Sequence, residues 1–179
     1  MRVITGSARG RKLIEPKSMD IRPTLDSVKE SIFNILQFDI EGRRILDLFA
    51  GTGQLGIEAL SRGAKSATFV DENNEALAIV RTNLEKCSLR GEVVRENAVT
   101  FLEHCGKFDV IILDPPYESK LMDAVLRKII QFDILSDSGI IVCETSIETD
   151  VAPLSAPYFI GRIYKYGKVK LTVCGKSAN

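Results

Sequence analysis

The sequence has no tryptophan, one histidine and four cysteines among its 179 residues, and this shortage argues against two kinds of site. The cysteines are scattered over positions 87, 105, 143 and 174 without a C-x-x-C pair, and only His104 is available to join them. Zinc sites and disulfide frameworks need more numerous or more closely spaced partners. We therefore expect buried thiols and no metal site.

Long apolar runs are also missing. No run approaches the roughly 20 residues that span a bilayer, and the early residues are charged without the apolar core of a signal peptide. A chain of this length suits one domain, and 45% hydrophobic with 27% charged residues is ordinary for a soluble globular protein. We expect a cytoplasmic monomer with no membrane partner.

The formal net charge is zero, but both ends of the chain are basic. Residues 1–22 contain six basic and two acidic side chains, and residues 161–179 contain five basic side chains and no acid. If the two ends lie on one face of the fold, they form a phosphate-binding surface. Scattered solvated lysines are the alternative.

The start of the chain predicts a hairpin followed by a helix. Strand-like pieces at residues 2–5 and 12–15 indicate a small basic β-hairpin, within an extension of residues 1–20, that projects from a main domain of residues 21–179. Apolar residues at helical spacing then predict a helix over residues 25–36. Its inward side chains are Leu25, Val28, Ile32, Ile35 and Leu36, and its outer or edge side chains are Lys29, Glu30 and Asn34.

Strand-like and helical segments alternate in the rest of the chain. The expected strands are residues 45–48, 66–70, 92–95, 108–113 and 139–143, the expected helices are residues 54–61, 73–87, 98–105 and 120–132, and a closing hairpin spans residues 159–174. This order predicts a Rossmann-like α/β fold, in which a seven-stranded, mostly parallel sheet has helices on both faces and a C-terminal antiparallel hairpin. Ligands of such sheets bind at the carboxyl ends of the strands.

Residues 47–56, D-L-F-A-G-T-G-Q-L-G, predict a strand end, a glycine turn and a helix start. Gly51 and Gly53 allow a sharp turn and a close approach to a ligand, and Gly56 allows the helix to pack closely on the strand. A plain tight turn is the alternative. Asp47, at the strand tip, would repel a pyrophosphate but attract a cationic amine. This favours S-adenosylmethionine over NAD.

Two other strand ends carry residues that suit this ligand. Asp71 follows Gly53 by 18 residues, close to the roughly 20-residue interval of an acid that binds ribose hydroxyls. A carboxylate at a helix start is the alternative. Asn97 and Ala98 are placed to border an adenine ring, although Asn97 is also a common type of helix cap.

A second motif, Asp114-Pro115-Pro116-Tyr117, combines an acceptor, two rigid residues without an N–H donor and an aromatic ring. The Asp114 carboxylate and the Pro115 carbonyl would accept the two hydrogens of an exocyclic amine and direct its lone pair toward a methyl donor. Tyr117 would stack on the base. A structural turn is the alternative interpretation of these four residues.

These motifs, in this order, resemble a class I S-adenosylmethionine-dependent methyltransferase of the amino-methylating kind. More narrowly, residues 10–13 (G-R-K-L), 22–34 with R-P-T at their start, and 56–64 (G-I-E-A-L-S-R-G-A) resemble the bacterial 16S ribosomal RNA guanine-N2 methyltransferase family over nearly the whole length. Lys29 stands where an arginine is more usual in the family, and Thr52 and Gln54 stand where smaller residues are common.

The resemblance implies methylation of one guanine of 16S ribosomal RNA, within the small subunit or an assembly intermediate, with Asp114, Pro115 and Tyr117 at the target base. It also implies that residues 22–26 close over the cofactor. The predicted cofactor residues are Arg22, Thr24, Asp47, Phe49, Gly51, Thr52, Gly53, Leu55, Asp71, Glu72, Asn97, Ala98 and Asp114. The predicted RNA-binding residues are Arg9, Arg11, Lys12 and Lys168.

Three alternatives remain at this stage. A DNA adenine-N6 or protein glutamine methyltransferase uses a related acceptor motif, but the first generally carries an additional recognition region and the second is expected to have Asn at position 114. An NAD-dependent oxidoreductase would account for the glycine motif but would give no reason for the second motif, Asp114 to Tyr117. A non-enzymatic RNA-binding module would account only for the basic ends.

Overall fold

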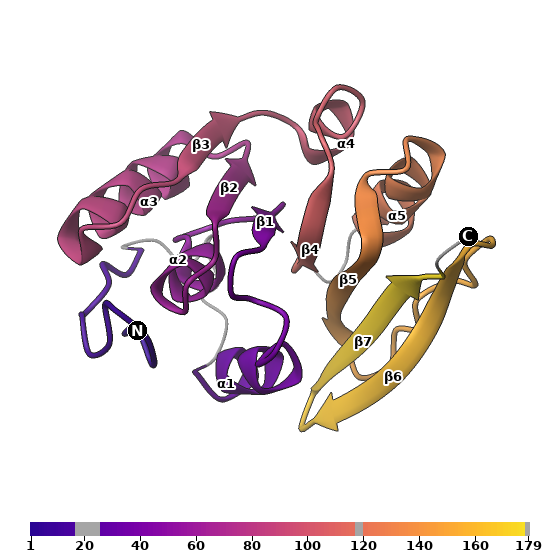
Figure 1. The fold of residues 1–179 in the computed structure, drawn as a ribbon, viewed down its shortest axis with the longest axis horizontal. Coiled ribbons are helices and arrows are strands. Elements are labelled where there is room, and N and C mark those ends of the chain that lie inside the picture. Colours follow the sequence, from indigo (N-terminus) through magenta and orange to yellow (C-terminus); the bar gives the residue numbers. More distant parts are fainter. Residues whose placement is uncertain (17–25, 117–119, 178–179) are drawn as a thin grey trace.

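The fold is described from a computed structural model, for residues 1–16, 26–116 and 120–177. A twisted sheet carries helices on both of its faces (Figure 1). In chain order the elements are α1 (Asp26–Ile35), β1 (Arg44–Asp47), α2 (Gln54–Ser61), β2 (Ser66–Asp71), α3 (Asn74–Cys87), β3 (Glu92–Arg95), α4 (Ala98–Phe101), β4 (Phe108–Leu113), α5 (Leu121–Gln131), β5 (Leu135–Ser146), β6 (Tyr158–Tyr166) and β7 (Val169–Lys176). Within the described ranges, the helices are too short or too polar to cross a membrane.

The seven strands lie in the order β3-β2-β1-β4-β5-β7-β6. Strands β1 to β5 are parallel to one another, whereas β7 runs antiparallel to both β5 and β6. The predicted fold class is therefore confirmed, including the C-terminal antiparallel hairpin. The strand order reverses between β1 and β4, and in open α/β sheets this is where ligands bind, at the carboxyl ends of the strands.

Each face of the sheet has its own core. On one face, Ile32 of α1, Ile57 of α2 and Val80 of α3 belong to one buried cluster. On the other face, Phe101 of α4 and Val125 of α5 belong to a second cluster. Strand β4 separates the two clusters, and its residues 110–113 alternate between them, which explains why these four positions are all apolar.

Helix α2 lies so close to β2 that Gly56 has no room for a side chain. A Cβ atom at this position would lie 2.3 Å from Cε1 of Phe69, a buried ring on β2. This contact confirms that Gly56 allows close packing of the helix on the sheet.

We expect Gly56→Ala to lower the free energy of unfolding by about 2 kcal/mol, because overpacking against the Phe69 ring outweighs the better helix propensity of alanine. Gly106→Ala is the matched control, since a Cβ atom there meets nothing within 4 Å. Urea denaturation measures both. Equal stability of the two variants would contradict the packing account.

The N-terminal segment (residues 1–16) packs on the body of the protein, so the prediction that it projects is wrong. Its two arms pair at one antiparallel bridge, between Arg2 and Lys12, and through further backbone hydrogen bonds on either side of it. The fully buried Glu58 of α2 accepts hydrogen bonds from the backbone N–H groups of Ile4, at 2.7 Å, and Thr5, at 3.0 Å. Pattern alone indicates two arms of a hairpin but not the surface on which they dock. The predicted boundary near residue 20 lies outside the described residues.

Gly6 explains how closely the turn of this segment approaches α2. Its φ of 87° lies in the left-handed region, and a Cβ atom there would lie 1.7 Å from the Ser61 carbonyl oxygen. The Ser61 hydroxyl accepts from the N–H of Ala8 at 2.9 Å and donates to the Thr5 carbonyl at 2.6 Å. The turn is therefore fixed to the C-terminal end of α2.

Helix α1 follows most of the predicted apolar face, but Ile35 is only partly buried and the fully buried Phe33 was not among the predicted inward residues. Val28, Ile32 and Leu36 are buried, and Glu30 and Asn34 are exposed as predicted, whereas Leu25 lies outside the described residues. Lys29, predicted at an outer or edge position, is fully buried, and its ammonium group donates to the Arg2 carbonyl at 2.6 Å. Helical spacing did not predict this burial because the hydrogen-bond acceptor comes from the N-terminal segment, and Asp26 on the same helix adds an ion pair at 3.5 Å.

Two other elements differ in length from the predictions. Helix α4 ends at Phe101 rather than near residue 105. Strand β5 begins at Leu135, because Ser136-Asp137-Ser138-Gly139, which have a loop-like composition, continue the strand through an irregularity in its pairing with β4. Cys87, Cys143 and Cys174 are buried, Cys105 is partly exposed, and all four are free thiols.

Candidate active site

The loop between β1 and α2, residues 48–53, has the glycine geometry that the sequence predicts, and we call it the glycine loop. Gly51 has a φ of 51° and Gly53 a φ of 77°, both in the left-handed region that L side chains rarely adopt. Gly53 is the N-cap of α2 and has no side chain that could accept the first N–H groups of the helix. These groups lie at the carboxyl end of β1, where they need acceptors from elsewhere.

Two of the predicted acids hold this loop. Asp71, at the end of β2, accepts the Gly51 N–H through Oδ2 at 2.9 Å and the Asn73 N–H through Oδ1 at 2.8 Å. Asp47, at the end of β1, accepts the Gly56 N–H through Oδ2 at 2.9 Å. The two carboxylates thus fix the backbone at the carboxyl ends of β1 and β2.

The carboxyl group of Asp47 is only 2% exposed. Burial is the main cause that raises the pKa of Asp47 to about 7; the hydrogen bond from Gly56 opposes the rise, and the negative charges of Asp114 and Asp71 add to it. Three acids therefore converge where β1, β2 and β4 end. Such a cluster is stabilised by a cation and destabilised by an anion.

The second motif begins directly after β4. Asp114 is partly buried, Pro115 is buried and Pro116 is exposed. Because Asp47 pairs with Ile112 in the parallel register, Asp114 follows the strand beside Asp47, and its charge acts on the Asp47 carboxyl group. The structure thus brings the two motifs together, although 67 residues separate Asp47 from Asp114. Tyr117, Arg22 and Thr24 lie outside the described residues.

Asn97 is a helix cap, which was one of its two interpretations. Its Oδ1 accepts the N–H groups of Val99, at 3.0 Å, and Thr100, at 3.3 Å, at the start of α4. It follows the end of β3 by two residues, so Asn97 and the buried Ala98 also lie along the carboxyl edge of the sheet.

The remaining predicted cofactor residues are close to the glycine loop or to Asp71. Thr52 and Leu55 are buried. Phe49 is partly exposed and packs against the cluster of α4 and α5. Glu72 is exposed, and its carbonyl accepts from Arg95 Nε at 3.3 Å.

The predicted RNA-binding residues are all exposed, but they do not form one continuous patch. Arg9 lies in the turn that packs on the C-terminal end of α2, one helix length from the glycine loop. Lys168 lies between β6 and β7, where its carbonyl accepts from Ile147 N–H at 2.9 Å just beyond the end of β5. The N-terminal segment and the β6–β7 hairpin occupy opposite ends of the sheet (Figure 1).

Sequence reasoning missed two buried polar residues, Glu58 and Asn83. Glu58 fixes the N-terminal segment, as described above. Asn83 of α3 is fully buried and contacts both that segment and the glycine loop. A polar residue next to Leu84, on the inward side of a predicted helix, was the signal that could have drawn attention to Asn83.

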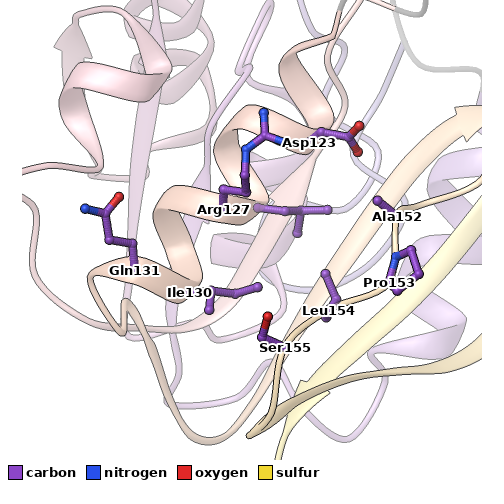
Figure 2. Close-up of a pocket in the computed structure, with 9 residues that line it drawn as sticks. Asp123, Arg127, Ile130, Gln131, Ala152, Pro153, Leu154 and Ser155 are labelled. Atoms are coloured by element: carbon purple, nitrogen blue, oxygen red, sulfur yellow. The ribbon is translucent and has the colours of Figure 1, made fainter.

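A groove lies away from these residues, between α5 and the segment before β6 (Figure 2). It has a volume of about 340 Å³ and contains none of the predicted site residues. Its lining residues are Asp123, Leu126, Arg127, Ile130, Gln131, Ala152, Pro153, Leu154 and Ser155. Over residues 1–16, 26–116 and 120–177, histidine, cysteine and acidic side chains do not gather in a group of three or more that could hold a metal ion.

The family model described as Conserved hypothetical protein 95 matches residues 1–175. The chain belongs to this family. YlbH of Bacillus subtilis (strain 168) is 39% identical over 182 residues, which cover 98% of this chain and 99% of YlbH. Ribosomal RNA small subunit methyltransferase D of Escherichia coli (strain K12) is 34% identical over 171 residues, covering 94% of this chain and 86% of that protein.

Solved structures agree with the family assignment. The structure of yhhF from Escherichia coli has a TM-score of 0.91 at 31% identity, covering 100% of this chain and 99% of that chain. Together with the strand order, this likeness identifies a class I methyltransferase fold. The glycine loop and the end of β4 therefore occupy the strand ends at which such a fold binds its ligands.

Proposed function

We propose that this protein transfers a methyl group from S-adenosylmethionine to the exocyclic N2 amine of one guanine in 16S ribosomal RNA, within the small subunit or an assembly intermediate. The observation that carries the proposal is the convergence of Asp47, the glycine loop and Asp114-Pro115 at adjacent strand ends. The name of the Escherichia coli relative, a ribosomal RNA small subunit methyltransferase, supports the substrate class.

The glycine loop and its acids fit the proposed methyl donor. Asp47 combines burial with a raised pKa, so a cationic amine placed near it would favour the ionised carboxylate. Both oxygens of Asp71 accept backbone N–H groups, but each keeps a second lone pair for a ribose hydroxyl. SMU.776, a solved structure with the same fold, was determined in complex with SAH. Bound here, S-adenosylmethionine would supply an electrophilic methyl group.

The residues after β4 orient the acceptor. The Asp114 carboxylate and the Pro115 carbonyl accept the two amine hydrogens, so that the nitrogen lone pair is directed away from them. Asp114 need not be a strong base, because the nitrogen becomes acidic as it gains a methyl group. Tyr117 stacks on the guanine in this proposal.

RNA contacts are proposed for Arg9, Arg11, Lys12 and Lys168. We expect reversal of Arg9, Arg11 and Lys12 to glutamate to weaken RNA binding and to reduce the slope of log K against log salt by about 2–3, since each lost phosphate contact contributes nearly one unit. Arg127→Glu is the control, because this exposed arginine lies on α5, whose core cluster is on the other face of the sheet from that of the N-terminal segment. Filter binding over a salt series measures the slope, and an unchanged slope would mean that these residues are only solvated.

The direct test of the reaction uses small subunits from cells that lack this activity. Transfer of a tritiated methyl group to their RNA, followed by nucleoside analysis, is expected to give methylguanosine modified at N2. Label confined to protein or to another nucleoside would contradict the proposal.

A further inference from the structure

We propose that Asn83 is a positioning residue for the cofactor, which fixes the glycine loop from outside by holding the Thr52 carbonyl. The inference rests on the proposed function only in taking S-adenosylmethionine as the ligand of the loop. Asn83 itself belongs to α3 and lies outside every motif that the sequence offers.

The loop needs such a restraint because Thr52 lies between two glycines. Gly51 and Gly53 are both in the left-handed region, and glycine has more backbone freedom than any other residue. The Gly51 N–H is held by Asp71, and the Gly53 N–H donates to the Ala50 carbonyl at 2.7 Å. The Thr52 carbonyl is held by Asn83 Nδ2 at 3.1 Å.

The amide of Asn83 uses both of its chemical ends. Its Oδ1 accepts the Ile14 N–H at 2.7 Å, and its Nδ2 donates to the Thr52 carbonyl and, at 3.4 Å, to the Ile14 carbonyl. A carboxylate cannot replace it, because a carboxylate accepts hydrogen bonds but does not donate them. An apolar side chain of the same size would leave buried backbone groups without partners.

These bonds make the N-terminal segment a brace for the loop. Ile14 belongs to this segment, which is fixed to α2 through Glu58 and Ser61. At the same place the Thr52 hydroxyl contacts Met1 Sδ at 3.7 Å, and Thr52 is buried. Asn83 thus joins the glycine loop to a segment that is itself anchored at a second point, so the position of Thr52 depends on both.

Glu58 provides a matched control for a purely structural role. Like Asn83, it is fully buried and accepts backbone N–H groups of the N-terminal segment, those of Ile4 and Thr5. Its other hydrogen bond is from Arg62 Nε at 2.8 Å, not from the glycine loop. Glu58→Gln should therefore loosen the segment without directly releasing Thr52.

The experiment compares Asn83→Leu, Asn83→Ser and Glu58→Gln with the unmodified chain. We expect the Asn83 variants to raise the Kd for S-adenosylmethionine about tenfold, the effect of losing one buried hydrogen bond to the loop, while kcat at saturating cofactor stays within about threefold. In the ligand-free protein, amide exchange at Gly53 should accelerate. Glu58→Gln should lower Tm but leave the Kd for S-adenosylmethionine and the amide exchange rate of Gly53 near their original values.

Equal effects of the Asn83 and Glu58 variants on Kd and on Gly53 exchange would overturn the proposal, as would unchanged values in the Asn83 variants. If Asn83→Leu does not fold, Asn83→Ser decides the question, because a smaller side chain leaves space for water. Failure of the proposed function is distinguishable: a wrong cofactor would leave the unmodified chain unable to bind S-adenosylmethionine, and a wrong acceptor would leave these Kd and exchange measurements unaffected.

Discussion

Asp114→Ala is expected to lower kcat for methyl transfer by at least about 10²–10³-fold, the usual effect of removing one preorganised polar group from a reacting centre. The Kd for S-adenosylmethionine should change much less than kcat, because the lost carboxylate serves mainly the acceptor amine. Its removal also takes away a negative charge that raises the pKa of Asp47, so Asp47 should ionise more readily. Single-turnover transfer and calorimetry separate the two quantities.

Asp109→Ala is the matched control for this variant. Asp109 lies on the same strand, near its opposite end, where its carboxylate pairs with Arg44 at 3.0 Å. That substitution should lower Tm and leave the transfer rate nearly unchanged. Near-normal turnover of Asp114→Ala would rule out the role that we propose for its carboxylate.

Asp47→Asn is expected to raise the Kd for S-adenosylmethionine about 10- to 100-fold, because a charge-assisted hydrogen bond to the cationic amine is replaced by a neutral one. The effect should depend on pH. Since the pKa of Asp47 is about 7 in the ligand-free protein, binding of a cation below this pH must release a proton. Affinity should therefore rise about tenfold per unit between pH 5.5 and 6.5 and level off above pH 8.

Calorimetry in buffers of different ionisation enthalpy measures this proton release directly. The Asp47→Asn variant should release no proton over the same range. Because the folded-state pKa of Asp47 is raised, its contribution to the stability of the ligand-free protein is largest in acid and is lost as pH rises from about 4 to about 7. Proton release that persists in the variant would assign the effect to another group.

Much of the sheet could be predicted because its signals are local. The apolar run of β4 indicates burial on both faces, and the regular alternation of strands and helices indicates parallel pairing. The start of β5 was missed because its first residues have the composition of a loop and join the sheet only through pairing with β4. The same limitation applies to Lys29, whose acceptor is a backbone carbonyl 27 residues away.

In the candidate site, too, residues with a local role could be predicted from the sequence, and residues that act through distant contacts could not. Gly51, Gly53 and Gly56 were predictable from the local sequence. The first two adopt the left-handed backbone of the turn, and Gly56 leaves room for the close packing of α2 on β2. Asn83 was not, since it contacts Ile14 across 69 residues of sequence. The assignments of Arg22, Thr24 and Tyr117 stay predictions, because these residues lie outside the described ranges.

Identification of the methylated atom tests the central claim most directly. Small subunits from cells lacking this activity are incubated with the protein and S-adenosylmethionine carrying a deuterated methyl group, and the digested RNA is analysed by mass spectrometry against nucleoside standards. The account predicts one labelled N2-methylguanosine per 16S RNA and, over the same incubation time, at least about 100-fold less label with the Asp114→Ala variant. Label at adenine N6, at another atom of guanine or in ribosomal protein would contradict it.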